Sequence, residues 1–328
     1  MERKQFGTTD LSVSPLGFGS SLLSGGYGKR DDVRSLETIH EAVKRGINFF
    51  DTADAYGNGH SEELLAEALK KYDENFVIGT KFGNQRSDDG SYNGVDGRPD
   101  KVAGYCEASL KRLGCDSVDI YYLHRVDPEV PIEETVGAMA RLVEAGKVRF
   151  LGLCEASADT LRRAHAVHPI SALQTEYSLW TRDVEVTTLP ACRELGIAFV
   201  AYAPLGRGFL SGAIRKNQRF NDNDRRPNFP RFSSENLAKN LELLEPLEVM
   251  AADKNVSPAE IALAWLLVQG DEVTPVFGTM KIDHLASNIA ALEVSLSADD
   301  IATLDVAFAP GVAVGNRYPD KRMHLVAG

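Results

Sequence analysis

Polar side chains end six short apolar runs of the sequence, and their types could carry acid–base chemistry on a carbonyl group. They are Asp51, Lys81, His124, Cys154 with Glu155, Gln174 and Tyr202. If the runs are parallel strands of a barrel, their carboxyl ends share one rim and these side chains converge there. One such residue usually serves the structure, but six at one level indicate a functional site.

Tyr56, five residues beyond Asp51 in DTADAYG, is the candidate proton donor. An ordinary phenol is a poor acid at neutral pH because its pKa is about 10. An ammonium such as Lys81 about 4 Å away would contribute roughly 4 kcal/mol at an effective dielectric of about 20, which could lower that pKa to about 7 at the limit. Asp51 is needed to keep the lysine charged against desolvation, and His124 could orient a carbonyl oxygen toward the phenol.

The elements that position these residues form repeated strand–helix units. Seven apolar runs predict strands, at Ile47 to Phe50, Phe76 to Gly79, Val118 to Leu123, Val148 to Leu153, Ile170 to Leu173, Ile197 to Ala201 and Val273 to Phe277, with a weaker eighth at Leu11 to Phe18. Helices are expected to start near Asp31, Ser61, Pro131, Ser157 and Ser257. This rhythm predicts an α/β fold, a (β/α)8 TIM barrel in a single domain over residues 1–328. The rival doubly wound sheet would carry GxGxxG after its first strand, which the sequence lacks.

Two segments break the strand–helix rhythm. Asn84 to Arg98 and Arg207 to Phe232 are long and polar and follow strands. We therefore expect long loops over the C-terminal mouth of the barrel, where substrates bind. The tail from Ala309 to Gly328 either covers the site or is disordered.

Composition and charge narrow the classes of binding partner that the protein could have. The 328 residues carry a net charge of −11 at pH 7, which disfavours binding to nucleic-acid phosphates. No apolar run reaches membrane-spanning length and the N-terminus lacks the apolar run of a signal peptide, so we expect no membrane partner and a cytoplasmic protein. The four cysteines have no metal-ligand spacing, so no metal is expected. The partner predicted is a small carbonyl substrate, with a monomer as the default state and a homo-oligomer as the alternative.

Beyond these inferences, the sequence resembles the aldo-keto reductases. DTADAYG, the lysine after FVIGT and the histidine after DIYYL match family blocks, and LGFGS, KVRFLGLCEAS, LQTEYSLW, AYAPLGRGFLSG and GTMKIDHLASN follow in the family order over nearly the whole chain. APLGRGFLSG, LQTEYSLW and ALAWLL are most similar to the plant and microbial branch of NADP-dependent carbonyl reductases that includes perakine-reductase-like enzymes. The resemblance implies hydride transfer from a nicotinamide to an aldehyde or ketone, with Tyr56 as proton donor, Lys81 and Asp51 as its modulators and His124 as the orienting group.

The resemblance also implies a set of cofactor-binding residues. It comprises Cys154, Glu155, Gln174, Tyr202, Pro204, Leu205, Gly206, Arg207, Gly278, Thr279, Lys281, His284 and Asn288. In the family, the matching positions hold the nicotinamide carboxamide (Cys154, Glu155, Gln174), stack on its ring (Tyr202), line the pyrophosphate (204–207) and contact the adenosine 2′-phosphate and adenine (278–288).

The sequence departs from the family pattern in two places. Cys154 and Glu155 stand where relatives usually have Ser and Asn, so a weak thiol donor and a carboxylate acceptor face the carboxamide. Gly278 stands where many relatives have Lys, and His284 where they often have Arg, which weakens the 2′-phosphate signal. Lys281 and the start of the following helix could still bind a phosphate, so NADPH is favoured over NADH.

Two other functions are compatible with the sequence. A regulatory or scaffold protein of the same fold, as in potassium-channel β subunits, would bind the cofactor to report redox state. A barrel lyase or isomerase would use Lys81 as a Schiff base, which its pairing with Asp51 opposes.

Overall fold

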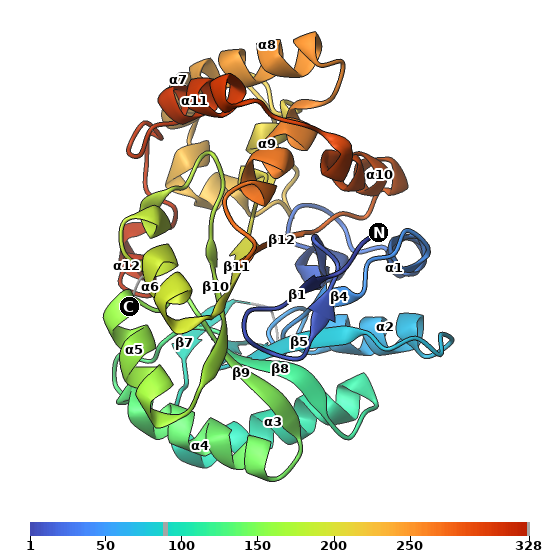
Figure 1. Cartoon of the computed structure of the whole chain (residues 1–328), viewed down its shortest axis with the longest axis vertical. Helices are drawn as coiled ribbons and strands as arrows, with labels where there is room; N and C mark the ends of the chain where they lie inside the picture. Colours follow the sequence, from blue (N-terminus) through green and yellow to red (C-terminus); the bar gives the residue numbers. More distant parts are fainter. Residues whose placement is uncertain (88–90, 327–328) are drawn as a thin grey trace.

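The computed structural model describes residues 1–87 and 91–326 and contains a closed barrel of eight parallel strands (Figure 1). In barrel order the strands are β3 (Gly17–Gly19), β4 (Phe49–Asp51), β5 (Val77–Phe82), β8 (Val118–Leu123), β9 (Val148–Cys154), β10 (Ile170–Glu176), β11 (Ala198–Tyr202) and β12 (Val273–Phe277). Pairing of β12 with β3 closes the barrel. The predicted (β/α)8 barrel is confirmed, and all seven strong apolar runs lie on its strands.

Helices surround the barrel on its outside. Those between or after the strands are α1 (Asp32–Lys44), α2 (His60–Leu69), α3 (Pro99–Leu113), α4 (Ile132–Glu144), α5 (Ala158–Val167), α6 (Thr188–Leu195), α9 (Pro258–Leu267) and α10 (Ile282–Ala290). Four more are α7 (Ser234–Asn240), α8 (Glu245–Asp253), α11 (Ala298–Ala307) and α12 (Asp320–Met323). In Figure 1, α3 and α4 lie at the bottom and α7, α8 and α11 at the top.

Helix starts follow the predicted caps with one exception. The side chains of Asp31, Ser157 and Ser257 each accept a backbone N–H in the first turn of α1, α5 and α9. The start predicted near Ser61 is confirmed to within one residue, but the N-cap of α2 is Gly59, whose φ of +94° suits glycine. Ser61 is instead buried, and its hydroxyl bonds Ser20 Oγ at 2.6 Å.

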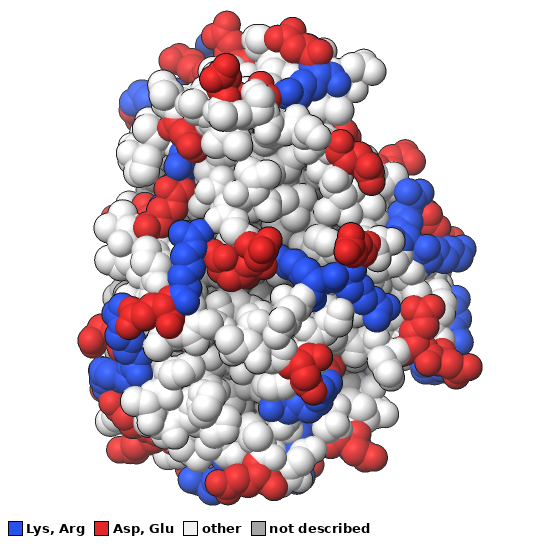
Figure 2. All heavy atoms as spheres, viewed as in Figure 1, with Lys and Arg blue, Asp and Glu red and all other residues white. Residues whose placement is uncertain are grey.

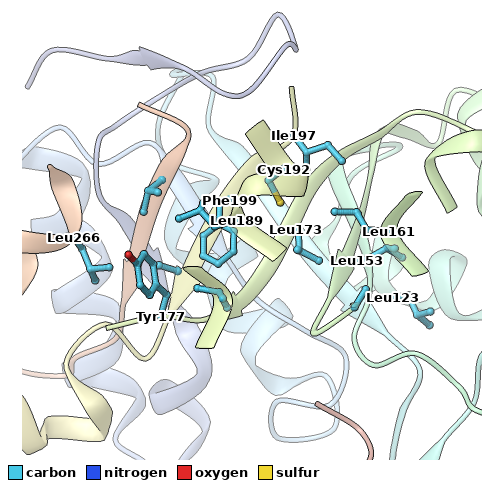
Figure 3. Close-up of a cluster of buried hydrophobic side chains, with 14 of the residues drawn as sticks. Leu123, Leu153, Leu161, Leu173, Tyr177, Leu189, Cys192, Ile197, Phe199 and Leu266 are labelled. Atoms are coloured by element: carbon cyan, nitrogen blue, oxygen red, sulfur yellow. The ribbon is translucent and has the colours of Figure 1, made fainter. Parts of the chain in front are cut away.

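A layer of apolar side chains joins the strands to the outer helices (Figure 3). Leu153, Leu173 and Phe199 from the strands meet Leu161 and Leu189 from the helices, and all are buried. Each fully buried side chain of this size contributes roughly 1.5–3 kcal/mol relative to exposure. This packing fixes the barrel on which the rim residues sit.

Inward-facing side chains fill the barrel beneath the rim. Lys81 is in register with Tyr122 on β8, and Tyr122 with Gly152 on β9. Gly152 has no side chain, and a Cβ there would collide with the ring of Tyr122. At the opposite end the antiparallel hairpin β1 (Lys4–Gln5) and β2 (Ser12–Val13) precedes the barrel, and Phe6 beside it packs edge-on against Phe49 with ring centres 5.4 Å apart.

Two irregular segments differ from their sequence interpretation. The weak run from Leu11 to Phe18 is divided between β2 and β3, because Pro15 interrupts it. The expected loop from Asn84 to Arg98 contains an antiparallel ribbon of β6 (Asn84–Arg86) and β7 (Tyr92–Val95), and its residues 88–90 lie outside the described residues.

The other two long segments are ordered where they are described. The segment from Arg207 to Phe232 consists mainly of short turns, and its Asp224 forms a β-bridge with Tyr27 across the mouth. The tail is described as far as residue 326; residues 327–328 lie outside the described part.

The outer surface mixes both signs of charge. On the face shown in Figure 2, basic and acidic side chains alternate without a large patch of one sign. Exposed ion pairs of the molecule include Arg149 with Asp10 and Arg163 with Glu133. None of the helices in the described residues combines the length and apolarity that crossing a membrane requires.

Candidate active site

The four predicted catalytic residues meet at the carboxyl ends of β4, β5 and β8. Lys81 Nζ donates to Asp51 Oδ1 at 2.5 Å, to the backbone oxygen of Thr52 at 2.7 Å and to the Tyr56 hydroxyl at 3.3 Å. The rings of Tyr56 and His124 are edge to face with centres 5.7 Å apart. A carbonyl oxygen between that phenol and that imidazole would be within reach of both.

Local backbone bonds hold this cluster. The Asp54 N–H donates to the Lys81 carbonyl at 3.1 Å, so the turn that carries Tyr56 is tied to β5. The His124 N–H donates to the Phe82 carbonyl at 2.8 Å, which fixes the residue just after β8. The four predicted catalytic side chains are therefore held at the strand ends or on the backbone just beyond them.

Electrostatics keep Lys81 charged. Burial alone would lower the pKa of Lys81, but Asp51, then Tyr56 and Cys154, raise it above its ordinary value. A Schiff base requires a neutral amine, so this ion pair argues against the lyase alternative.

The expected lowering of the Tyr56 pKa does not occur in the protein alone. Burial raises the pKa of Tyr56, and the opposing effect of Lys81 is smaller, with Asp51 raising it further. Tyr56 is therefore a protonated phenol at neutral pH, and Lys81 can stabilise negative charge only as it develops on the oxygen. Burial, then Lys81 and Arg125, hold the pKa of His124 well below its usual range, so its imidazole is neutral.

Cys154 on β9, Gln174 on β10 and Tyr202 on β11 lie beside this cluster. Gln174 Nε2 donates to Asp51 Oδ2 at 2.7 Å, and no described residue donates to its Oε1. Burial raises the pKa of the Cys154 thiol to about 12, so it is uncharged. The Tyr202 hydroxyl donates to Glu155 Oε1 at 2.8 Å.

Glu155 is held by a residue that the sequence analysis did not identify. Arg317 of the tail donates from both Nη atoms to its carboxylate, at 3.0 and 2.9 Å, and both side chains are buried. Burial alone would raise the pKa of Glu155, but Arg317 and then Arg125 bring it below its ordinary value. The adjoining Tyr318 hydroxyl lies 2.9 Å from that of Tyr202. The tail thus covers part of the mouth, which is the first of the two alternatives expected for it.

The signal that could have identified Arg317 is Glu155 itself. A carboxylate directly after an apolar strand is buried, and a buried carboxylate needs a cation. The sequence NRYPD in the tail offers one, but at a separation of 162 residues no local pattern connects the two.

Arg207 forms an ion pair that the sequence analysis did not identify. Its Nη atoms donate to both oxygens of buried Glu176, each at 2.8 Å, and its guanidinium lies 4.5 Å from the ring centre of Phe229. This ion pair holds the side chain beside β10, and its expected role as a pyrophosphate ligand stays a prediction. Pro204, Leu205 and Gly206 form the turn after β11, where Trp180 packs so close to Gly206 that a Cβ would lie 2.9 Å from its ring.

The late segment surrounds the start of α10. Gly278 closely approaches the barrel's first strand, because a Cβ there would lie 2.8 Å from the Gly19 carbonyl oxygen. Lys281 and His284 are exposed at the first turn of α10, with Thr279 and Asn288 buried beside them. The Lys281 N–H donates to Thr279 Oγ1 at 3.0 Å.

Comparison with known proteins identifies the family of this chain. The family model of the aldo/keto reductase family matches residues 15–308. A probable aldo-keto reductase of Glycine max is 46% identical over 317 residues, which cover 96% of this chain and 91% of that protein.

Solved structures agree as well. A glycerol dehydrogenase from Gluconobacter oxydans has a TM-score of 0.86 at 28% identity, covering 97% of this chain and 98% of its own. A thermostable aldo-keto reductase in complex with the inhibitor epalrestat has a TM-score of 0.75 at 29% identity, covering 94% of this chain and all of its own. The chain therefore belongs to the aldo/keto reductase family.

Proposed function

We propose that this protein reduces the carbonyl group of an aldehyde or ketone to an alcohol with NADPH, and that Tyr56 is the proton donor. The observation that carries the proposal is the contact of the buried Lys81 ammonium with both Asp51 and the Tyr56 hydroxyl, at 2.5 and 3.3 Å. This contact is suited to a phenol that is protonated before the reaction. The ammonium would then stabilise the negative charge that develops on the phenol oxygen as its proton leaves.

The other residues divide the remaining tasks. The neutral imidazole of His124 donates to the carbonyl oxygen and keeps it beside Tyr56. Asp51 holds Lys81 charged and positions Gln174 through the 2.7 Å bond. The carbonyl oxygen receives the Tyr56 proton, so the product leaves as the neutral alcohol.

The site is compatible with a nicotinamide cofactor. When bound, the reduced cofactor supplies a hydride to the carbonyl carbon. The free Oε1 of Gln174 could accept from the carboxamide, and the half-buried ring of Tyr202 could stack on the nicotinamide. For the 2′-phosphate, Lys281 and His284 combine positive charge with the N-terminal end of α10, which favours NADPH over NADH.

The test compares wild type with Tyr56→Phe and with the control Tyr72→Phe, which removes a hydroxyl bonded to His40 outside the barrel. Fluorescence titration measures binding of NADPH and NADH, and NADPH oxidation is followed with a panel of aldehydes and ketones. We expect Tyr56→Phe to bind NADPH as tightly as wild type but to lose turnover by about 10²–10⁴-fold. Full turnover in Tyr56→Phe would refute the role of Tyr56, and absence of binding by wild type would refute the reductase.

A further inference from the structure

Buried carboxylates at the mouth of the barrel are already matched with cations. The three pairs are Asp51 with Lys81, Glu155 with Arg317 and Glu176 with Arg207. Within each pair the opposite charges neutralise one another. Each of these carboxylates therefore already has a cation in direct contact, although further arginines lie nearby.

Arg125 is such an additional cation, and it follows catalytic His124 directly. Its Nη1 donates to the His124 carbonyl oxygen at 2.6 Å and its Nη2 to the Tyr318 hydroxyl at 3.3 Å. The guanidinium carbon lies 6.0 and 5.9 Å from the ring centres of Tyr202 and Tyr318. Within residues 1–87 and 91–326, no carboxylate lies within 4 Å of it. A partly buried guanidinium in this state would be stabilised by an anion arriving with the substrate.

Arg322 lies on α12, four residues beyond the Tyr318 that Arg125 contacts, and Tyr92 lies on β7. The guanidinium of Arg322 lies 4.3 Å from the ring centre of Tyr92, and it too has no carboxylate partner in the described part of the chain. The Tyr92 hydroxyl is buried without a hydrogen-bond partner among those residues. Burial raises the pKa of Tyr92, whereas the positive charges of Arg322 and then Arg125 oppose this rise.

We propose that Arg125, with Arg322 and the Tyr92 hydroxyl, selects carbonyl substrates that carry a carboxylate. The planar guanidinium matches a carboxylate through paired N–H donors. The expected phosphate contacts of the cofactor follow β11 and β12, whereas Arg125 follows β8 beside the reacting carbonyl. The anion therefore belongs to the substrate. The carboxylate itself does not react: the carbonyl carbon gains the hydride and its oxygen gains the Tyr56 proton.

This inference rests on the proposed function, so its test uses one aldehyde in two charge states. 4-Carboxybenzaldehyde and its neutral methyl ester, methyl 4-formylbenzoate, are reduced by wild type, Arg125→Gln and Arg322→Gln. The control is Arg149→Gln, which removes the same charge at the start of β9, at the opposite end of the barrel. The quantity compared is the ratio of kcat/KM for the acid to that for the ester, together with the Kd of NADPH.

We expect wild type to prefer the acid, and the ratio to fall by about 10- to 100-fold in Arg125→Gln, by less in Arg322→Gln and not in Arg149→Gln. The kcat/KM of the acid, but not of the ester, should also fall with ionic strength. A wild-type preference for the ester, or an unchanged ratio in both mouth variants, would overturn the inference and leave the reductase intact. A weaker NADPH Kd in Arg125→Gln with an unchanged ratio would assign the arginine to the cofactor instead and would likewise overturn it. Failure of wild type to reduce any carbonyl compound would refute the proposed function itself.

Discussion

Replacing Arg317 by methionine is expected to destabilise the entire barrel, even though residue 317 belongs to the tail. The substitution leaves Glu155 buried without the cation that donates to both of its oxygens. Removing one partner of a buried pair of this kind costs about 3–5 kcal/mol. For a chain of 328 residues, that corresponds to a fall of roughly 4–7 °C in melting temperature.

The assay is thermal and urea unfolding of Arg317→Met, Glu155→Met and the double variant. The double variant removes both charges together, so it should recover much of the loss, with a coupling free energy of about 2 kcal/mol or more. Arg163→Met is the matched control, because Arg163 also forms two 2.8 Å hydrogen bonds to one carboxylate, that of Glu133, but both side chains are exposed. Its melting temperature should change little.

Two results would refute this reasoning. One is a melting temperature of Arg317→Met no lower than that of the exposed control. The other is strict additivity in the double variant, which would show that the pair does not act as a unit.

Three further predictions concern the rim. Lys81→Met leaves the Asp51 carboxylate buried without its cation. It should lower the unfolding free energy by about 3–5 kcal/mol in urea unfolding and reduce kcat by at least about 10²-fold in NADPH oxidation. A variant as stable as wild type would contradict this prediction. Burial, then Glu62, raises the pKa of Asp54 to about 7. The folded state therefore binds this proton more tightly than the unfolded state does. The resulting contribution to stability is full at low pH and is lost as the pH rises through 7. Asp54→Asn should therefore gain stability relative to wild type by up to about 4 kcal/mol between pH 4 and pH 8 in urea unfolding, and a pH-independent difference would disprove the assignment. Lys281→Gln should weaken NADPH binding about fivefold in fluorescence titration and leave NADH unaffected, whereas equal effects on both would remove the 2′-phosphate role.

The sequence predicted most accurately what is encoded locally. β8 and β12 begin and end at the predicted residues, because uninterrupted apolar runs are typical of strands covered on both faces. The rim residues Asp51, Lys81 and His124 could be identified because a polar group after such a run marks the mouth of a barrel.

What could not be predicted depends on contacts between distant segments. The side chain of Arg207 pairs with Glu176, 31 residues away in sequence, and only the tertiary structure brings these two charges together. The same holds for Tyr56, whose pKa depends on the balance between burial and Lys81, and burial is not visible in a sequence.

The contact between Gly152 and Tyr122 has an evolutionary consequence. The ring of Tyr122 occupies the space that any side chain at residue 152 would need, in register with Lys81. Neither residue can change alone without a collision or a cavity. Across related sequences we therefore expect the two positions to covary, with glycine on β9 wherever β8 carries a large ring, and a larger residue on β9 accompanied by a smaller one on β8.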